Sequence, residues 1–207
     1  MDKHTLDRVN EIKYLGVTLD NKLNWKPHLQ SVRLKISQGS YIISKLKHYI
    51  DIDVLKMIYY STVYPHLTYC VTSWGGSPKS NLLPLITLQK RILRIMTNSP
   101  YNSTSAPIFS KLKILPMEKI YHFNLAILFH KLHKRKILKP PSLNLLSQTH
   151  NYNTRLSKTH NYHQNYNRIN LGQQTYSSKG VKIWQKYLLN SNLSRLICSK
   201  KKLKITS

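Results

Sequence analysis

Two aspartates, Asp51 and Asp53, form the closest pair of carboxylates in the sequence and are the first candidates for catalytic metal binding. Two-metal phosphoryl transfer needs carboxylates that converge on ions ~4 Å apart. These two residues instead immediately precede an apolar stretch, where a carboxylate commonly accepts hydrogen bonds from the first amides of a helix. We therefore expect Asp53 to cap a helix, and we expect neither a catalytic residue nor a metal site in this chain.

Three pairs of His or Cys residues have spacings that could supply two metal ligands each. The pairs are His66 with Cys70, His130 with His133, and His160 with His163. Zinc sites need four ligands, and no second pair at a suitable spacing accompanies His66 and Cys70. We expect the first pair to be packed in the protein and the histidine pairs to face solvent or phosphate. Cys198 has no visible His partner that would make it a nucleophile.

The charge balance is the strongest global signal. The 207 residues include 33 Lys or Arg and 7 Asp or Glu, which gives a net charge of +26. An AT-rich coding sequence would also produce many Lys, Asn and Tyr residues, but it would not remove the acids. Such an excess exceeds what solubility requires and favours a polyanionic partner, for which nucleic acid fits better than a membrane surface.

Several features argue against secretion and membrane insertion. Cys70 and Cys198 are the two cysteines, too few for a disulfide framework, and no secretory signal is visible. No uninterrupted apolar run reaches the ~18 residues of a membrane span. We expect an intracellular chain, nuclear or cytoplasmic, without a membrane partner.

The longest mostly apolar run, residues 54–74, is dense in aromatic rings. Its spacing favours a helix with one buried stripe, and Pro65 predicts a kink or break near Tyr64. The expected stripe consists of Leu55, Ile58, Thr62 and Tyr69. Tyrosines of this run could stack on bases, but we expect them to pack in a core.

The flanking segments predict a mainly α-helical fold that begins with a short β-hairpin. Residues 13–25 are rich in β-formers around Asp20-Asn21, which we expect to form the hairpin turn, with Gly16 as a bulge in the first strand. Helical periodicity follows at 26–50, 82–97, 107–112, 117–136 and 179–189. We expect three parts: the hairpin at 1–25, connected helices at 26–139, and a basic, polar C-terminal region at 140–207.

Basic side chains on the predicted helix 82–97 are candidates for phosphate contacts. Lys90, Arg91 and Arg94 should be exposed there. Tyr152 and Arg155 lie in a polar stretch with little core to join, and nucleic-acid contact is one of two open interpretations for them.

Six motifs, taken in order, resemble the C-terminal part of non-LTR retrotransposon reverse transcriptases of the jockey-like kind. They are KYLGVTLDNKLNWKPHL at 13–29, IYYSTVYPHLTYCVTSWGG at 58–76, LLPLITLQKRILRIM at 82–96, APIFSKLKILPMEKIYHFNLAILFHK at 106–131, HNYNTR at 150–155 and YSSKGVKIWQ at 176–185. Each motif is weakly specific alone, but the order of all six is more specific.

The resemblance implies that Tyr14, Leu15 and Gly16 lie beside a primer strand, and that helices 26–97 form a thumb over the template–primer duplex. The family's catalytic carboxylates lie in palm motifs upstream of this hairpin, so we expect this chain alone not to polymerise DNA. Mg²⁺ is expected in that palm and no cofactor in this chain. The expected partners are RNA, DNA or their hybrid, and the palm region of a parent polymerase.

Two further interpretations remain open. The chain could be a stand-alone basic RNA- or DNA-binding protein, either a domesticated remnant or a ribonucleoprotein subunit. It could also be a purely structural helical scaffold, which predicts no salt-dependent binding to nucleic acid.

Overall fold

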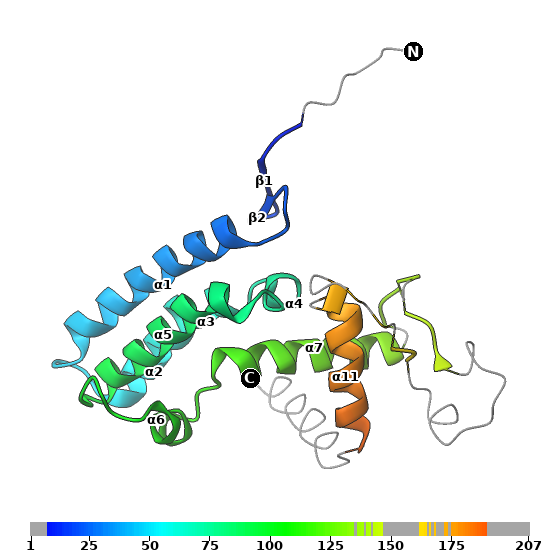
Figure 1. Cartoon of the computed structure of the whole chain (residues 1–207). Coiled ribbons are helices and arrows are strands. Elements are labelled where there is room, and N and C mark those ends of the chain that lie inside the picture. The colour runs from blue at the N-terminus through cyan, green and yellow to red at the C-terminus, as the bar shows by residue number, and fades with distance from the viewer. Residues whose placement is uncertain are drawn as a thin grey trace. The chain divides into compact units, whose positions relative to one another are not determined.

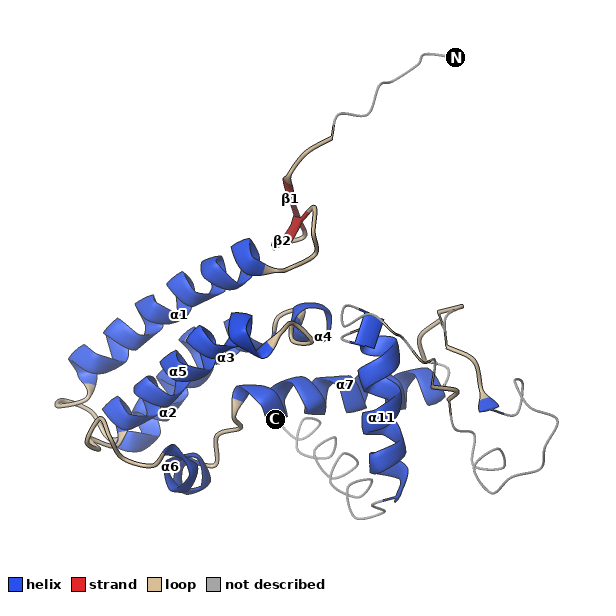
Figure 2. Cartoon of the chain, viewed as in Figure 1, coloured by secondary structure: helices blue, strands red, loops and turns tan. Residues whose placement is uncertain are grey.

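The computed structural model describes residues 8–134, 136–138, 140–141, 143–146, 162–164, 166, 168, 172–173 and 175–189. These residues are mainly helical, with a two-stranded antiparallel hairpin near the N-terminus, as the sequence predicts (Figures 1 and 2). The chain divides into two compact units, Met1–Ile120 and Tyr121–Ser207. The three-part division expected from the sequence stays a prediction.

The first unit begins with the hairpin and continues as a set of packed helices. Its elements are β1 (Glu11–Tyr14), β2 (Val17–Asp20), α1 (Lys26–Leu46), α2 (Ile52–Thr62), α3 (Tyr64–Thr68), α4 (Val71–Trp74), α5 (Lys79–Met96) and α6 (Ser105–Leu112). Helix α7 (Met117–His133) begins in this unit and continues into the second. Among the described residues, no helix combines the length and the apolarity needed to cross a bilayer.

The hairpin turns at Leu15-Gly16, so the predicted turn at Asp20-Asn21 and the predicted bulge at Gly16 are wrong. Tyr14 pairs with Val17, which leaves a two-residue loop. Leu15 and Gly16 have φ values of 46° and 79°, and positive φ at both central positions defines a type I′ turn. Glycine adopts this conformation without strain, whereas leucine does so at a cost of about 1–2 kcal/mol.

Asp20 has a different role from the one expected, because it organises the entry into α1. Its carboxylate accepts hydrogen bonds from the backbone amides of Asn24, at 3.0 Å, and Trp25, at 2.8 Å. Burial alone would raise the pKa of Asp20, but these amide hydrogen bonds lower it overall. The carboxylate thereby holds Trp25 in the left-handed conformation, with φ of 62°, that precedes the helix.

Helix α1 packs along α5, α2 and α3 within the first unit. The predicted apolar period is confirmed at its buried positions, which are Leu29, Val32, Ile36 and Ile43. Gly39 marks the closest approach to α2: a Cβ there would lie 2.8 Å from Val63 Cγ2 and 3.1 Å from Thr62 Oγ1. The missing side chain therefore lets the two helix backbones approach each other.

The predicted break before Pro65 is confirmed, since α2 ends at Thr62 and α3 begins at Tyr64. Two details differ from the prediction. Asp51, not Asp53, occupies the N-cap position, and it makes no side-chain capping bond. The buried stripe follows a four-residue period and consists of Leu55, Tyr59, Val63, Leu67 and Val71. Ile58 and Thr62 flank this stripe and are half-buried, and Tyr69, which lies between the stripe positions Leu67 and Val71, is exposed.

A buried amide, that of Gln89 on α5, joins three segments of the first unit. Its Nε2 donates to the Tyr59 hydroxyl at 2.9 Å and to the Leu115 carbonyl at 3.0 Å. Its Oε1 accepts from the backbone amide of Met117 at 2.9 Å. Burial raises the pKa of Tyr59 well above its usual value, so this phenol stays protonated.

Helix α5 begins at Lys79, with Pro78 in the N-cap position, so Ser80 and Asn81 lie inside the helix, which begins three residues before the predicted range 82–97. Its apolar residues Leu85 and Ile92 are buried, whereas Leu88 and Ile95 are half-buried. Gln89 also lies in the core, which a purely apolar pattern did not reveal.

The second unit includes most of α7 and helix α11 (Tyr176–Leu189), with an isolated bridge between Leu145 and Tyr162. Leu125, Leu132, Val181 and Trp184 are among its buried residues. A Cβ on Gly180 would overlap the Phe129 ring, so glycine is required where α11 meets that ring.

Replacement of Gln89 by Leu should destabilise the protein by about 2–5 kcal/mol, because it leaves several buried polar groups without partners. Tyr59→Phe removes only one of the hydrogen bonds and should cost about 1 kcal/mol. Urea unfolding followed by circular dichroism measures both changes. Equal losses for the two variants would show that the amide network contributes no more than its single Tyr59 bond.

Candidate nucleic-acid interface

The tip of the hairpin is exposed, yet it is fixed to the helices. Tyr14 and Leu15 are 64% and 72% exposed. The Tyr69 hydroxyl donates a 2.5 Å hydrogen bond to the Leu15 carbonyl. The Tyr69 ring also lies against Gly16, where a Cβ would be 3.6 Å from Tyr69 Cε1. The turn is therefore held from one side by a tyrosine 54 residues further along the chain.

The position of Tyr69 is set by the connection between α3 and α4. The Trp74 indole Nε1 donates to the Tyr69 carbonyl at 2.8 Å, and Trp74 is fully buried. Cys70 has φ of 49°, which turns the chain sharply after Tyr69. Sequence reasoning placed Tyr69 in the core and missed its role, and no local pattern links it to Leu15.

His28 on α1 forms a second contact with the hairpin. Its Nδ1 accepts a hydrogen bond from the Thr18 amide at 3.4 Å. The ring is buried and lies edge-to-face with Trp25 and Trp74, at centroid distances of 6.4 and 5.8 Å. Burial, followed by the charge of Lys35, lowers the pKa of His28. The imidazole is therefore neutral, and its Nε2 has no hydrogen-bond partner among the described residues.

A neutral, buried His28 makes stability depend on pH. Because its pKa is lower in the folded protein than the ~6.5 of an unfolded chain, the unfolded state binds more protons below that value. Stability should therefore be complete above pH ~6.5 and fall as the pH drops below it. In His28→Gln, unfolding free energy measured in urea should fall less between pH 7.5 and 5. The exposed His48→Gln should keep the full wild-type dependence, and an unchanged dependence in His28→Gln would contradict the assignment.

Removal of the Tyr69 hydroxyl should loosen the hairpin. In Tyr69→Phe, we expect amides of β1 and β2 to exchange with solvent several-fold faster, because a hydrogen bond with a net worth of about 0.5–1.5 kcal/mol is lost. Hydrogen exchange followed by mass spectrometry reports this locally. Tyr49→Phe is the matched control, since Tyr49 is exposed and lies outside this contact. Equal exchange rates of the β1 and β2 amides in both variants would show that the Tyr69 hydroxyl does not stabilise the hairpin.

The basic residues of α5 differ from the expectation that all three are exposed. Arg91 is exposed, but Lys90 and Arg94 are half-buried. The Arg94 guanidinium donates from Nε at 3.1 Å and from Nη2 at 3.0 Å to the Ser103 carbonyl. It also lies 5.9 Å from the centroid of the Tyr101 ring. Arg94 therefore fixes the loop after α5 and has fewer donors left for a ligand.

Other candidate residues are only partly brought together. Tyr152, Arg155 and His160 lie outside the described residues, so their predicted roles stay predictions. His66 belongs to α3 whereas Cys70 follows its end, so they do not lie on one helix, and both are half-buried. Within the described part of the chain, no group of three or more His, Cys, Asp or Glu residues could hold a metal ion.

The tyrosines of the central stretch are also less buried than expected. Tyr59 is in the core, but Tyr60 and Tyr69 are exposed and Tyr64 is half-buried. Tyr60 meets the rings of Tyr59 and Tyr64 edge-on, at centroid distances of 5.6 and 5.1 Å.

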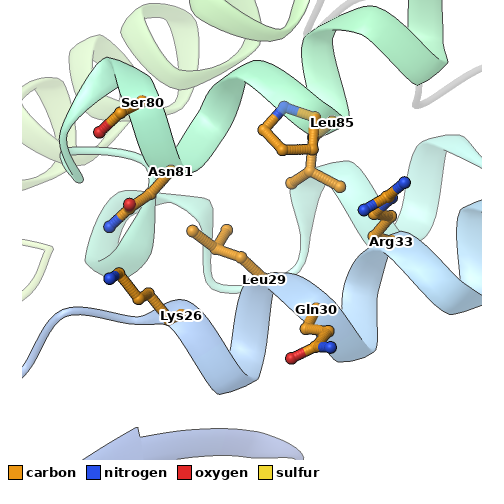
Figure 3. A pocket seen from close by; sticks show the side chains of 8 residues that line it. Lys26, Leu29, Gln30, Arg33, Ser80, Asn81 and Leu85 are labelled. Carbon is orange, nitrogen blue, oxygen red and sulfur yellow. The ribbon is translucent and has the colours of Figure 1, made fainter.

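A cleft between α1 and α5 was not foreseen from the sequence. Its volume is about 230 Å³. Lys26, Leu29, Gln30 and Arg33 line it from α1, and Ser80, Asn81, Pro84 and Leu85 line it from α5 (Figure 3). The seven-residue spacing of Lys26 and Arg33 was the one available signal, because it places both cations on the same face of α1.

Three curated proteins illustrate what the chain is similar to. It is 28% identical over 118 residues to a probable RNA-directed DNA polymerase from transposon BS of Drosophila melanogaster. The aligned segment covers 55% of this chain and 13% of that protein. It is 31% identical over 106 residues to the RNA-directed DNA polymerase from mobile element jockey of the same species, 49% of this chain and 12% of that protein. The RNA-directed DNA polymerase from mobile element jockey of Drosophila funebris is 27% identical over 113 residues. That aligned segment covers 53% of this chain and 12% of the relative.

The chain is a homologue of transposon-encoded RNA-directed DNA polymerases. The resemblance to jockey-like non-LTR elements is thereby confirmed. The chain spans about an eighth of the length of these relatives. Neither a protein-family model nor a solved structure matches it.

Proposed function

We propose that this chain grips an RNA–DNA template–primer hybrid through its phosphates, as part of a retrotransposon polymerase. The observation that carries this proposal is the net charge of +26 in a homologue of RNA-directed DNA polymerases. Lysine and arginine that neutralise phosphates supply most of the sequence-independent affinity for nucleic acid. Arg91, exposed on α5, and its neighbour Lys90 are the proposed phosphate contacts on that helix.

The hairpin supports a role at the primer strand. A leucine in the left-handed conformation at an exposed tip is strained, and such strain is concentrated at functional sites. Tyr14, Leu15 and Gly16 are the proposed primer-side residues. Tyr69 holds this tip and His28 holds β2 at Thr18, so the helices would set where the primer lies.

The outer strand of the hairpin supports contact with the palm region of a parent polymerase. All four residues of β1 are exposed, including Ile12 at 54%. An open strand edge with apolar side chains is suited to pairing with further chain. Nucleotide addition itself would need Mg²⁺ bound by palm carboxylates, and the described residues of this chain offer no such cluster.

Hybrid binding should weaken as salt rises, and replacement of phosphate contacts should flatten that dependence. Lys90→Ala with Arg91→Ala should reduce the slope of log affinity against log salt by about 1–2 units, equally for hybrids of different sequence. Fluorescence anisotropy titrations at several salt concentrations measure the slope.

Lys111→Ala with Lys119→Ala provides the control, because it removes the same charge from exposed positions on α6 and α7. Equal changes of the salt slope in the two double variants would show that Lys90 and Arg91 of α5 do not contact the phosphates. Absence of any binding by the unaltered chain at low salt would overturn the proposed function.

A further inference from the structure

The cleft between α1 and α5 places positive charge at two separate points above an apolar floor. Figure 3 shows Lys26 beside Asn81 at one end and Arg33 at the other, with Leu29 and Leu85 between them. None of the eight described residues that line the cleft is acidic. The first turn of α5, which forms one wall, also has no acidic residue. An anionic ligand would thus meet two cations and no opposing carboxylate.

The polar groups of the cleft are suited to oxygen atoms. Asn81 Nδ2 donates one of its two hydrogens to the Asn24 carbonyl at 3.1 Å, which orients the amide, and its second N–H is the donor suited to a phosphate oxygen. The hydroxyl of Ser80 and the amide of Gln30 add further donors and acceptors. Phosphate oxygens accept hydrogen bonds, and ribose hydroxyls both donate and accept them, so the lining can serve either group.

The size of the cleft favours part of a polymer over a complete small molecule. Its volume of about 230 Å³ is below the ~300–1,000 Å³ of sites that enclose a drug-sized ligand. Lys26 and Arg33 are seven residues apart, about 10 Å along the helix axis. That separation matches roughly three nucleotides of a duplex strand at ~3.4 Å each along the axis. The two cations can therefore contact different phosphates of one strand.

We propose that this cleft binds the sugar–phosphate backbone of a single strand, with Lys26 and Arg33 on separate phosphates. Leu29, Pro84 and Leu85 form the apolar floor under the sugars between these phosphates. The inference rests on the proposed function and deepens it, because it assigns a second binding site on a different helix from Lys90 and Arg91. The shared chemistry is the phosphodiester, which either an RNA or a DNA strand supplies.

The test compares two double variants of α1 that lose the same charge. Lys26→Ala with Arg33→Ala should reduce the salt slope of hybrid binding by about 1.4–1.8 units, at ~0.7–0.9 per phosphate contact. Lys35→Ala with Lys45→Ala should change it by less than half as much, because these exposed lysines do not line the cleft. Parallel titrations with single-stranded RNA, single-stranded DNA and the hybrid identify which strand the cleft holds.

A bulky substitution tests the same site without a change in charge. Ser80→Phe should obstruct the cleft and weaken binding several-fold, whereas Leu83→Phe, at an exposed position of α5 outside the cleft, should not. Far-ultraviolet circular dichroism and thermal melting verify that each variant is folded. If a charge variant is unfolded, the comparison of Ser80→Phe with Leu83→Phe still shows whether the cleft binds the strand.

The outcomes separate the two proposals. If the unaltered chain binds the hybrid but the cleft variants and their controls have equal effects, the cleft is not a binding site. The proposed function is then still supported. Absence of binding by the unaltered chain at low salt overturns both. A selective effect of the cleft variants supports the assigned site.

Discussion

The side-chain amide of Gln89 is the interaction on which the first unit depends. One buried group satisfies the Tyr59 hydroxyl of α2, the Leu115 carbonyl and the first amide of α7, so none of these three groups is buried without a hydrogen-bond partner. Because Gln89 lies on α5, this network fixes the rotation of that helix. The rotation in turn decides that Arg91 faces solvent and that Ser80 and Asn81 face α1.

In a chain with so few acids, repulsion between the many positive charges opposes folding. Two charged side chains nevertheless stabilise the fold through hydrogen bonds to the backbone. Asp20 holds the turn before α1, and Arg94 holds the loop after α5. Most of the remaining positive charge increases repulsion within the compact state. A polyanion that binds only the folded chain would relieve this repulsion and shift the equilibrium toward the native state.

The helices and the break before Pro65 could be predicted from periodicity and proline chemistry, because both signals are local. The hairpin turn could not be located, because Leu15 takes a conformation that its side chain disfavours and the tertiary contact with Tyr69 compensates. The partial burial of Arg94 could not be predicted either, because it depends on a contact with the Ser103 carbonyl, which lies in a loop without a periodic pattern. The cleft needs two helices side by side, so only half of its lining is encoded in any one segment.

The hydrogen bond from Tyr69 to Leu15 also constrains the order of events during synthesis on the ribosome. Translation proceeds at ~5–20 residues per second, so the 54 residues that separate the partners take roughly 3–10 s to add. Throughout that interval the hairpin exists without the tyrosine that will anchor it. An isolated two-stranded hairpin is only marginally stable in water, so the Leu15-Gly16 turn can be fixed in place only after the segment that carries Tyr69 has been made.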